Sequence, residues 1–430
     1  MSIRLRRLNF VMTLFLIGVS VYYFFLHWGV LIHIELTSSE IIISGLFDGI
    51  TTILSIYFLV INFWVNKKKF LIKKKDQFYF FLFLAWTGVC TISLILGFAY
   101  GHPMLDVVGD YYKFISFPLV FFLIYFATNS EMEISTWYIS LAIIWSFSVL
   151  LQVIVFHSDI LKGERLVSYN IILGSFFFLI TIFFVMFYNI PKWLFLFLIS
   201  AAILSVFCVI ISQLRAALIF IPVEIILLIL FKAKIEQKFK NVKQKLYLYL
   251  VLFSVFGGAF IFKSSYKYFF HRILTIFKSK GILLGILSQM GTRIPQLLII
   301  LNSFFHDPAK IWLGFGMGKG LHSSLYPSWA PNLAFFEMFG GLAGQRFIEI
   351  MPAEILYKTG LVNLLLFLTF NFFVLKYSFS KITSNRFYIL VFIMALIATI
   401  SFTYGGITFM GYVLYIPAFV GMLKAGEETV

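Results

Sequence analysis

The chain has 430 residues, of which 61% are hydrophobic and only 12% carry a charge, and its mean hydropathy is +0.98. A soluble domain carries about 25% charged residues, so this composition excludes a protein whose main solvent is water. The net charge of +16 would suggest nucleic acid in a soluble protein, but here the basic residues collect in short segments between apolar runs.

Apolar runs long enough to form membrane-spanning helices recur along the whole chain. An α-helix needs about 20 mainly apolar residues to cross the hydrocarbon of a bilayer. The pattern predicts an all-α polytopic membrane protein with about 12 transmembrane helices, in a single helical membrane domain over residues 1–430. The predicted spans are residues 9–32, 41–65, 78–99, 112–127, 137–156, 169–189, 193–212, 214–231, 246–262, 353–375, 387–404 and 407–423.

Basic residues predict the orientation of this bundle. If the N-terminus is cytoplasmic, the inner connections hold 20 of the 34 Lys and Arg residues, with dense clusters at 67–75 and 232–245. Cytoplasmic loops of membrane proteins are enriched in Lys and Arg, and anionic headgroups attract them. Both termini are therefore predicted to be cytoplasmic, membrane lipids account for the basic charge, and no nucleic-acid partner is expected.

Side chains capable of chemistry are unevenly distributed between the two predicted faces. All seven histidines fall on or near the outer side, whereas the two cysteines, Cys90 and Cys208, lie inside spans. The cysteines therefore support neither a disulfide framework nor a metal site. The histidines are consistent with chemistry on the outer face, and also with inner loops that are short and basic only for orientation.

The segment 263–352, between the ninth and tenth predicted helices, is the one long connection. Its apolar clusters at 273–277, 282–287, 297–305 and 333–338 are typical of short amphipathic helices that lie on a membrane or cap a bundle. We expect an ordered extracytoplasmic lid. The run GFGMGKG at 314–320 resembles a phosphate loop, but no buried strand precedes it, so nucleotide binding is not expected.

Two arginines stand out against apolar surroundings. Arg215 interrupts a nearly continuous apolar stretch, and a charge there should face a bundle interior or a water cavity; the alternative is an arginine that snorkels to the interface. Arg293 precedes an apolar run that has Pro295 in its first turn, which places a guanidinium beside free amides and suits an anion. The alternative is an exposed lid arginine.

Four carboxylates are further candidates. Glu349 and Glu354 lie where the lid enters the next helix, and either could accept a proton from a sugar hydroxyl; alternatively they form ion pairs with neighbouring arginines. Asp48 and Glu224 lie within spans. Asp48 could pair with an outer basic group, and Glu224 fits a polar helix contact or part of a proton path.

Four short segments follow one another in a characteristic order: GERLVSYN at 163–170, SQLRAAL at 212–218, Arg293 followed by IWLGFGMG at 311–318, and EIMPAEILYKTGLVNLL at 349–365. In this order and spacing they resemble the O-antigen ligase and polymerase superfamily of bacterial membrane enzymes. The resemblance covers roughly 160–370 by motif and the whole chain by topology. Two positions differ from the ligases: Glu349 replaces their histidine, and Asn363 replaces their second glycine after Gly360. These differences favour the polymerase (Wzy-type) branch.

The resemblance implies an enzyme of the bacterial inner (plasma) membrane that needs neither a metal nor another cofactor. On the outer face it would transfer a glycan from undecaprenyl diphosphate to another lipid-linked repeat unit, and a chain-length regulator is a candidate partner. The base stays open between Glu349 and His322. The remaining roles are the diphosphate site for Arg215, Arg293 and Arg272, and glycan or accessory contacts for Arg165, Lys319 and Glu354.

Other functions remain possible from the residues alone. The chain could be an O-antigen ligase, or a lipid-linked oligosaccharide flippase or solute transporter that uses Asp48, Glu224 and Arg215 as intramembrane charges. It could also be a noncatalytic assembly partner. A flippase needs polar residues along a path through the whole bilayer, whereas the polar candidates here gather at one face.

Overall fold

A computed structural model describes residues 76–127, 131–155, 174–212, 215–236, 293–328, 348, 350–400 and 415–424. Within these ranges the regular structure is helical, with no strand, so the all-α prediction is confirmed for this part of the chain. The elements are α3 (Gln77–Ala99), α4 (Met104–Ala127), α5 (Glu131–Val155), α8 (Gly174–Phe187), α9 (Lys192–Ser212), α10 (Arg215–Glu236), α14 (Arg293–His306), η2 (Pro308–Ile311), η3 (Ser323–Leu325), α15 (Met351–Ser380) and α16 (Phe387–Ile400). Residues 415–424 are also helical.

The predicted spans that fall in these ranges match helices, but several helices are longer than their apolar part. α4 begins at Met104, whereas the predicted span begins at 112. The prediction began late because the first two turns of the helix carry Asp106 and Asp110, which lower the hydropathy there. α10 continues to Glu236 through two lysines. The predicted spans 9–32, 41–65 and 246–262 lie outside the described residues.

Two of the described helices, α3 and α15, are long and apolar enough to cross a membrane. Large apolar side chains, among them Phe81, Ile95, Leu365 and Phe372, are exposed on these two helices. Soluble proteins rarely expose such contiguous apolar surface. The total of twelve spans stays a prediction.

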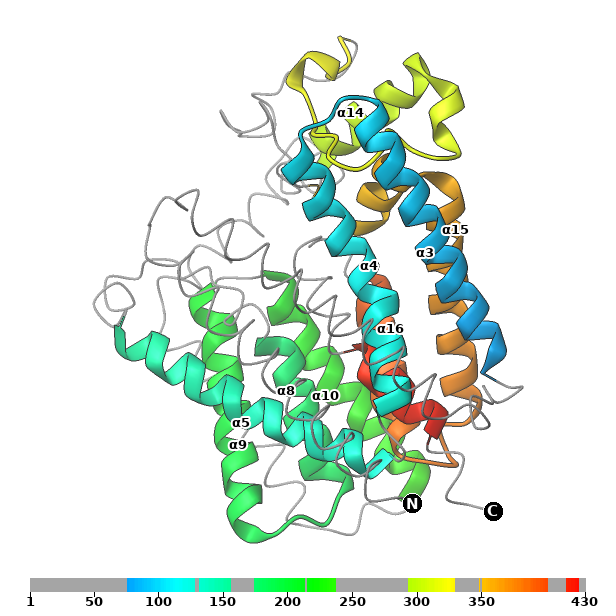
Figure 1. Cartoon of the computed structure of the whole chain (residues 1–430). Helices are drawn as coiled ribbons and strands as arrows, with labels where there is room; N and C mark the ends of the chain where they lie inside the picture. Colours follow the sequence, from blue (N-terminus) through cyan, green and yellow to red (C-terminus); the bar gives the residue numbers. More distant parts are fainter. Residues whose placement is uncertain are drawn as a thin grey trace, which may run out of the picture.

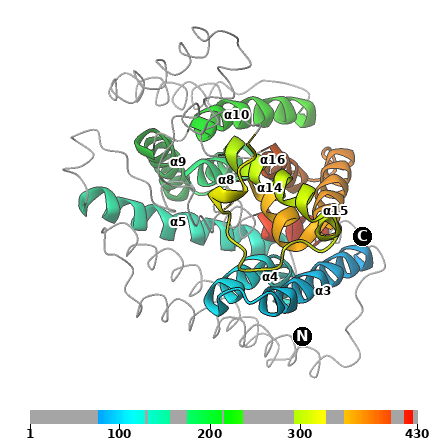
Figure 2. The same ribbon diagram turned by 90° about the horizontal axis from the view of Figure 1, so that it is seen from above.

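The described helices form two neighbouring groups. Figure 2 shows α3, α4 and α15 on one side and α8, α9 and α10 on the other, and α16 contacts members of both groups. The core of the first group is rich in phenylalanine: the rings of Phe83 and Phe121 stack with centroids 4.3 Å apart, and Phe370 packs against Phe83 at 5.1 Å. Each such aromatic pair adds about 0.5–1.5 kcal/mol beyond the area that it buries.

The two ends of the bundle differ in character. α14, η2 and η3 lie at the end where α3 ends and α4 begins, while the connections 188–191 and 381–386 lie at the opposite end (Figure 1). At that opposite end Lys232 donates to the Met186 carbonyl and Arg386 to the Phe187 carbonyl, so two cations satisfy the last carbonyl groups of α8. Which end faces the cytoplasm stays a prediction.

Part of the predicted lid is described. Residues 293–328 form α14, η2 and η3, and the predicted apolar cluster at 297–305 lies within α14. The clusters at 273–277, 282–287 and 333–338 lie outside the described residues. The extracytoplasmic location of this segment is a prediction that the fold leaves untested.

Candidate functional site

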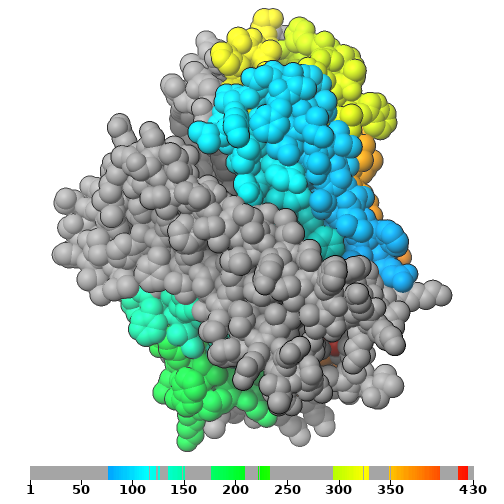
Figure 3. All heavy atoms as spheres, in the orientation of Figure 1, coloured from blue at the N-terminus to red at the C-terminus, as the bar shows by residue number. Residues whose placement is uncertain are grey.

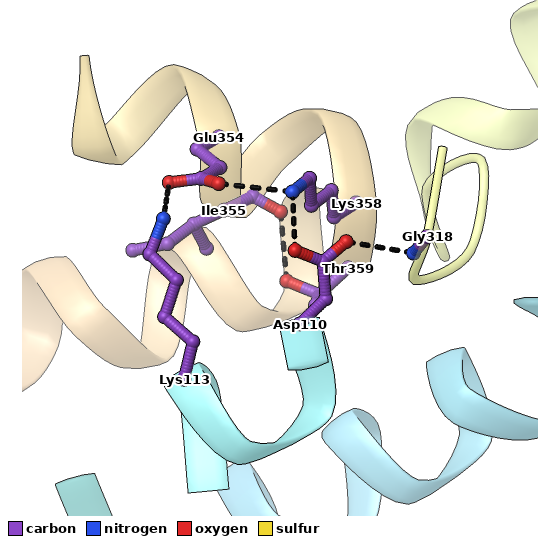
Figure 4. A network of polar contacts seen from close by, with 7 residues as sticks. All are labelled: Asp110, Lys113, Gly318, Glu354, Ile355, Lys358 and Thr359. Atoms are coloured by element: carbon purple, nitrogen blue, oxygen red, sulfur yellow. Dashed lines mark hydrogen bonds and ion pairs between the residues drawn. The ribbon is translucent and has the colours of Figure 1, made fainter. Parts of the chain in front are cut away.

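Four charged side chains from two helices form a continuous network at the α14 end of the bundle (Figure 4). Asp110 and Lys113 come from α4, and Glu354 and Lys358 come from α15. The Lys358 ammonium lies 2.6 Å from Asp110 Oδ1 and 3.0 Å from Glu354 Oε1. The other Glu354 oxygen, Oε2, pairs with Lys113. Both carboxylate oxygens of Glu354 are thus bound by lysines.

Within each helix, sequence spacing places the two charged residues on the same face. Residues three or four apart are neighbours on a helix, which applies to Asp110 with Lys113 and to Glu354 with Lys358. Glu354 also lies in the first turn of α15, where the helix dipole stabilises a negative charge.

The charges of the four described side chains balance, and the two that come from α15 are fully buried. The side chains of Glu354 and Lys358 are each 1% exposed, while those of Lys113 and Asp110 are 20% and 16% exposed. An isolated buried charge costs several kcal/mol, which only good pairing offsets. Two ammonium groups and two carboxylates supply that pairing here, and the network reaches the surface through α4.

The segment 311–320 is inserted among α3, α4 and α15 by means of alternate glycines. Gly314, Gly316 and Gly318 all have positive φ, at 75°, 81° and 81°. A Cβ atom would lie 2.6 Å from the Lys358 carbonyl carbon at Gly314, 2.8 Å from the Gly97 amide nitrogen at Gly316, and 2.7 Å from Val107 Cγ2 at Gly318. Each glycine therefore faces a different helix, and a larger residue would separate the segment from that helix.

Backbone amides of the same segment donate to the surrounding protein. The acceptors are the Lys310 carbonyl for Gly314 (2.7 Å), the Tyr357 carbonyl for Phe315 (2.8 Å), the Ser93 carbonyl for Met317 (3.1 Å) and Asp110 Oδ2 for Gly318 (2.7 Å). In a phosphate loop such amides point at the ligand. Here they hold the segment in place, and the Gly318 amide joins it to the ionic network.

α15 is interrupted where this segment meets it. Gly360 has φ 82° and ψ 179°, outside the helical region, and the Trp312 carbonyl packs against it. That carbonyl accepts a bond of 3.5 Å from the Val362 amide. One turn further, Asn363 donates to the Thr359 hydroxyl (3.0 Å) and approaches Cys90 Sγ (3.5 Å). Asn363 is thus a buried polar residue that contacts both its own helix and α3.

Three of the predicted site residues are described with their side chains, and all belong to this end of the molecule. Glu354 is part of the network, with lysines in place of the arginines that were expected. Lys319 is half-buried and directly follows Gly318. His322 is exposed, and its Nδ1 lies 3.1 Å from the Ser324 hydroxyl.

The predicted diphosphate site is not tested by the structure. α10 begins at Arg215 and α14 begins at Arg293, with Pro295 in its first turn as predicted, but neither arginine side chain is among the described ones. Arg165, Arg272 and Glu349 lie outside the described residues altogether.

Sequence reasoning missed three members of the network: Asp110, Lys113 and Lys358. A usable signal was present, because charged pairs at helical spacing inside apolar helices are costly and seldom incidental. The contact between the charged residues of α4 and those of α15 cannot be predicted from local sequence, because the two helices are far apart in the chain. Among the residues that the structure describes, no group of three or more His, Cys, Asp or Glu side chains is placed to hold a metal ion.

Glu224 of α10 is a different kind of buried acid. Its side chain is buried, and neither carboxylate oxygen has a hydrogen-bond partner among the described residues.

No family model, curated protein or solved structure matches this chain. Its function must therefore be inferred from its own residues and their geometry.

Proposed function

We propose that the chain is an O-antigen polymerase of the bacterial inner membrane, with both termini cytoplasmic. It transfers a glycan from undecaprenyl diphosphate to another lipid-linked repeat unit on the outer face. One observation carries the proposal most directly: two segments of the family resemblance, α14 with 311–318 and the start of α15, pack together at one end of the bundle around the ionic network. Catalysis at one face needs such convergence.

The leaving group sets the main chemical demand. A departing polyprenyl diphosphate concentrates negative charge, which arginine can bind through two parallel hydrogen bonds. Arg215 and Arg293 are the first residues of α10 and α14, so each is attached to a helix N-terminus, where free amides also favour an anion. Arg272 adds positive charge to the same site in this proposal.

The base is Glu349, with His322 as the alternative. Glu349 lies five residues before Glu354 in the chain and two residues before Met351, where α15 begins. Glu354 itself is a positioning residue, because both of its oxygens are occupied by lysines. Arg165 and Lys319 contact the glycan.

Reconstituted protein tests this activity. Given lipid-linked repeat units in nanodiscs, it should make longer lipid-linked glycans without ATP, nucleotide sugar or divalent metal, because the diphosphate linkage already stores the bond energy. Arg215→Lys or Arg293→Lys keeps the positive charge but loses the planar guanidinium group with its paired hydrogen-bond donors, so activity should fall sharply. Arg386→Lys, at the opposite end of the bundle, is the matched control and should stay active.

The base assignment has its own test. Glu349→Gln should bind the lipid-linked donor but turn over about 10²-fold or more slowly, since an amide cannot take the proton. A fully active Glu349→Gln beside an inactive His322→Ala would move the base to the histidine. If the protein moves lipid-linked sugars between leaflets without lengthening them, it is a flippase and not a polymerase. Transfer only to an acceptor other than a repeat unit would make it a ligase.

A further inference from the structure

α14 has two apolar faces, and only one of them is covered. Ile299, Ile300 and Phe304 are buried in a small cluster with Phe315 and Tyr357. On the other side Leu301 and Phe305 are exposed, Phe305 to 75%, and the turn after η2 adds the exposed side chains of Trp312 (59%) and Leu313. The helix and its following turn thus present apolar groups outward as well as inward.

This outward surface is continuous with that of α15. The Trp312 carbonyl accepts from the Val362 amide, so the turn lies directly against α15. From Val362 the exposed apolar side chains continue along α15 through Leu365 and Phe372. α15 is one of the two described helices able to cross a membrane, so whatever solvates its outer face also meets the turn.

The rim of the surface combines aromatic and basic groups. The Lys310 ammonium lies 4.6 Å from the Tyr100 ring centroid and 5.0 Å from that of Phe315, and it pairs with Asp307 at 3.0 Å. Trp and Tyr are enriched at membrane–water interfaces, and lysines there extend their ammonium groups toward water. In Figure 3 the α3–α4 pair and residues 293–328 form one continuous surface at this end.

We propose that α14, η2 and the turn that follows η2 lie in the interfacial region of the bilayer. Leu301, Phe305, Trp312 and Leu313 then contact lipid at the boundary between headgroups and acyl chains. The proposal rests on the membrane location assumed under the proposed function. Lipid is favoured over a protein partner because the surface continues that of a membrane-crossing helix and ends in an aromatic and basic rim.

Nitroxide labels at single cysteines test the position of this surface. The background is the full chain in nanodiscs with Cys90 and Cys208, both buried, replaced by alanine. Labels at Phe305→Cys and Trp312→Cys are compared for relaxation by oxygen, which enters lipid, and by a water-soluble nickel chelate. Leu301→Cys supplies another site on the same face should Trp312→Cys fail to fold.

Two further labels calibrate the result. Leu365→Cys reports the hydrocarbon beside α15, and Ser324→Cys, exposed at the same end of the molecule, reports water. Labels at Phe305 and Trp312 should relax more with oxygen than with the chelate, at a depth shallower than Leu365.

Three outcomes would overturn the inference. If the labels at Phe305 and Trp312 respond to the chelate as Ser324 does while Leu365 does not, the surface faces water although the bundle is in the membrane. If neither reagent reaches them, protein covers the surface, and dipolar coupling between labels would identify a second copy. If Leu365 also responds to the chelate, the membrane location in the proposed function fails as well.

Discussion

Replacing Lys358 with methionine is the sharpest test of the ionic network. Methionine keeps an unbranched side chain of similar length but removes the ammonium that lies 2.6 Å from Asp110 and 3.0 Å from Glu354. Removing one partner of a buried ion pair costs about 3–5 kcal/mol. Glu354 keeps Lys113 and Asp110 keeps the Gly318 amide, so we expect the lower end of that range, about 3 kcal/mol.

The measurement is thermal unfolding of the reconstituted protein, and Lys381→Met is the matched control. Lys381 is an exposed lysine immediately after α15, and exposed substitutions usually change stability by less than about 0.5 kcal/mol. Equal shifts in the two variants would refute the reasoning. Coupling is checked by adding Asp110→Asn to Lys358→Met: the double variant should lose less than the sum of the single losses, by about 0.5–3 kcal/mol.

Two further predictions concern single buried positions, both measured by the same unfolding midpoint. Gly316→Ala should destabilise the protein by more than about 1–2 kcal/mol, which is the cost of the left-handed backbone alone. The added Cβ would also lie 2.8 Å from the Gly97 nitrogen. The control is Gly88→Ala in α3, which has nothing within 4 Å of the added Cβ and should be neutral or slightly stabilising. Glu224→Leu should raise the midpoint, since both oxygens are buried without a described hydrogen-bond partner, and a lowered midpoint would reveal an interaction that stabilises the carboxylate.

The helices were the predictable part of this fold, and their ends the less predictable part. In a membrane every backbone amide must be satisfied within the segment, so a long apolar run strongly favours a helix. The pair predicted at 193–212 and 214–231 is found as α9 and α10 for this reason. Hydropathy measures the apolar part alone, however, and helices such as α4 and α10 continue into polar residues because helix propensity does not require apolarity.

The candidate site was predictable only in fragments. Glu354 could be singled out because a carboxylate at the start of an apolar helix is conspicuous. Its pairing with Lys113 spans 241 positions of sequence, and only the tertiary arrangement of α4 against α15 creates it. The glycines at 314, 316 and 318 were recognised as a motif, but their shared role, close approach to three helices, depends on backbone angles and neighbours that the letters do not encode.

In the proposed polymerase, the charge balance of the four described side chains limits the role of the network. Its two lysines already pair with Asp110 and Glu354, so drawing both lysines to a diphosphate would leave the buried Glu354 carboxylate without them, at a cost of several kcal/mol. In that proposal, arginines outside the network supply the positive charge for catalysis, and the network acts by holding α4, α15 and the segment 311–320 together. Substitutions in the network should then lower both the unfolding midpoint and the activity. Arg215→Lys or Arg293→Lys should lower the activity and leave the unfolding midpoint unchanged.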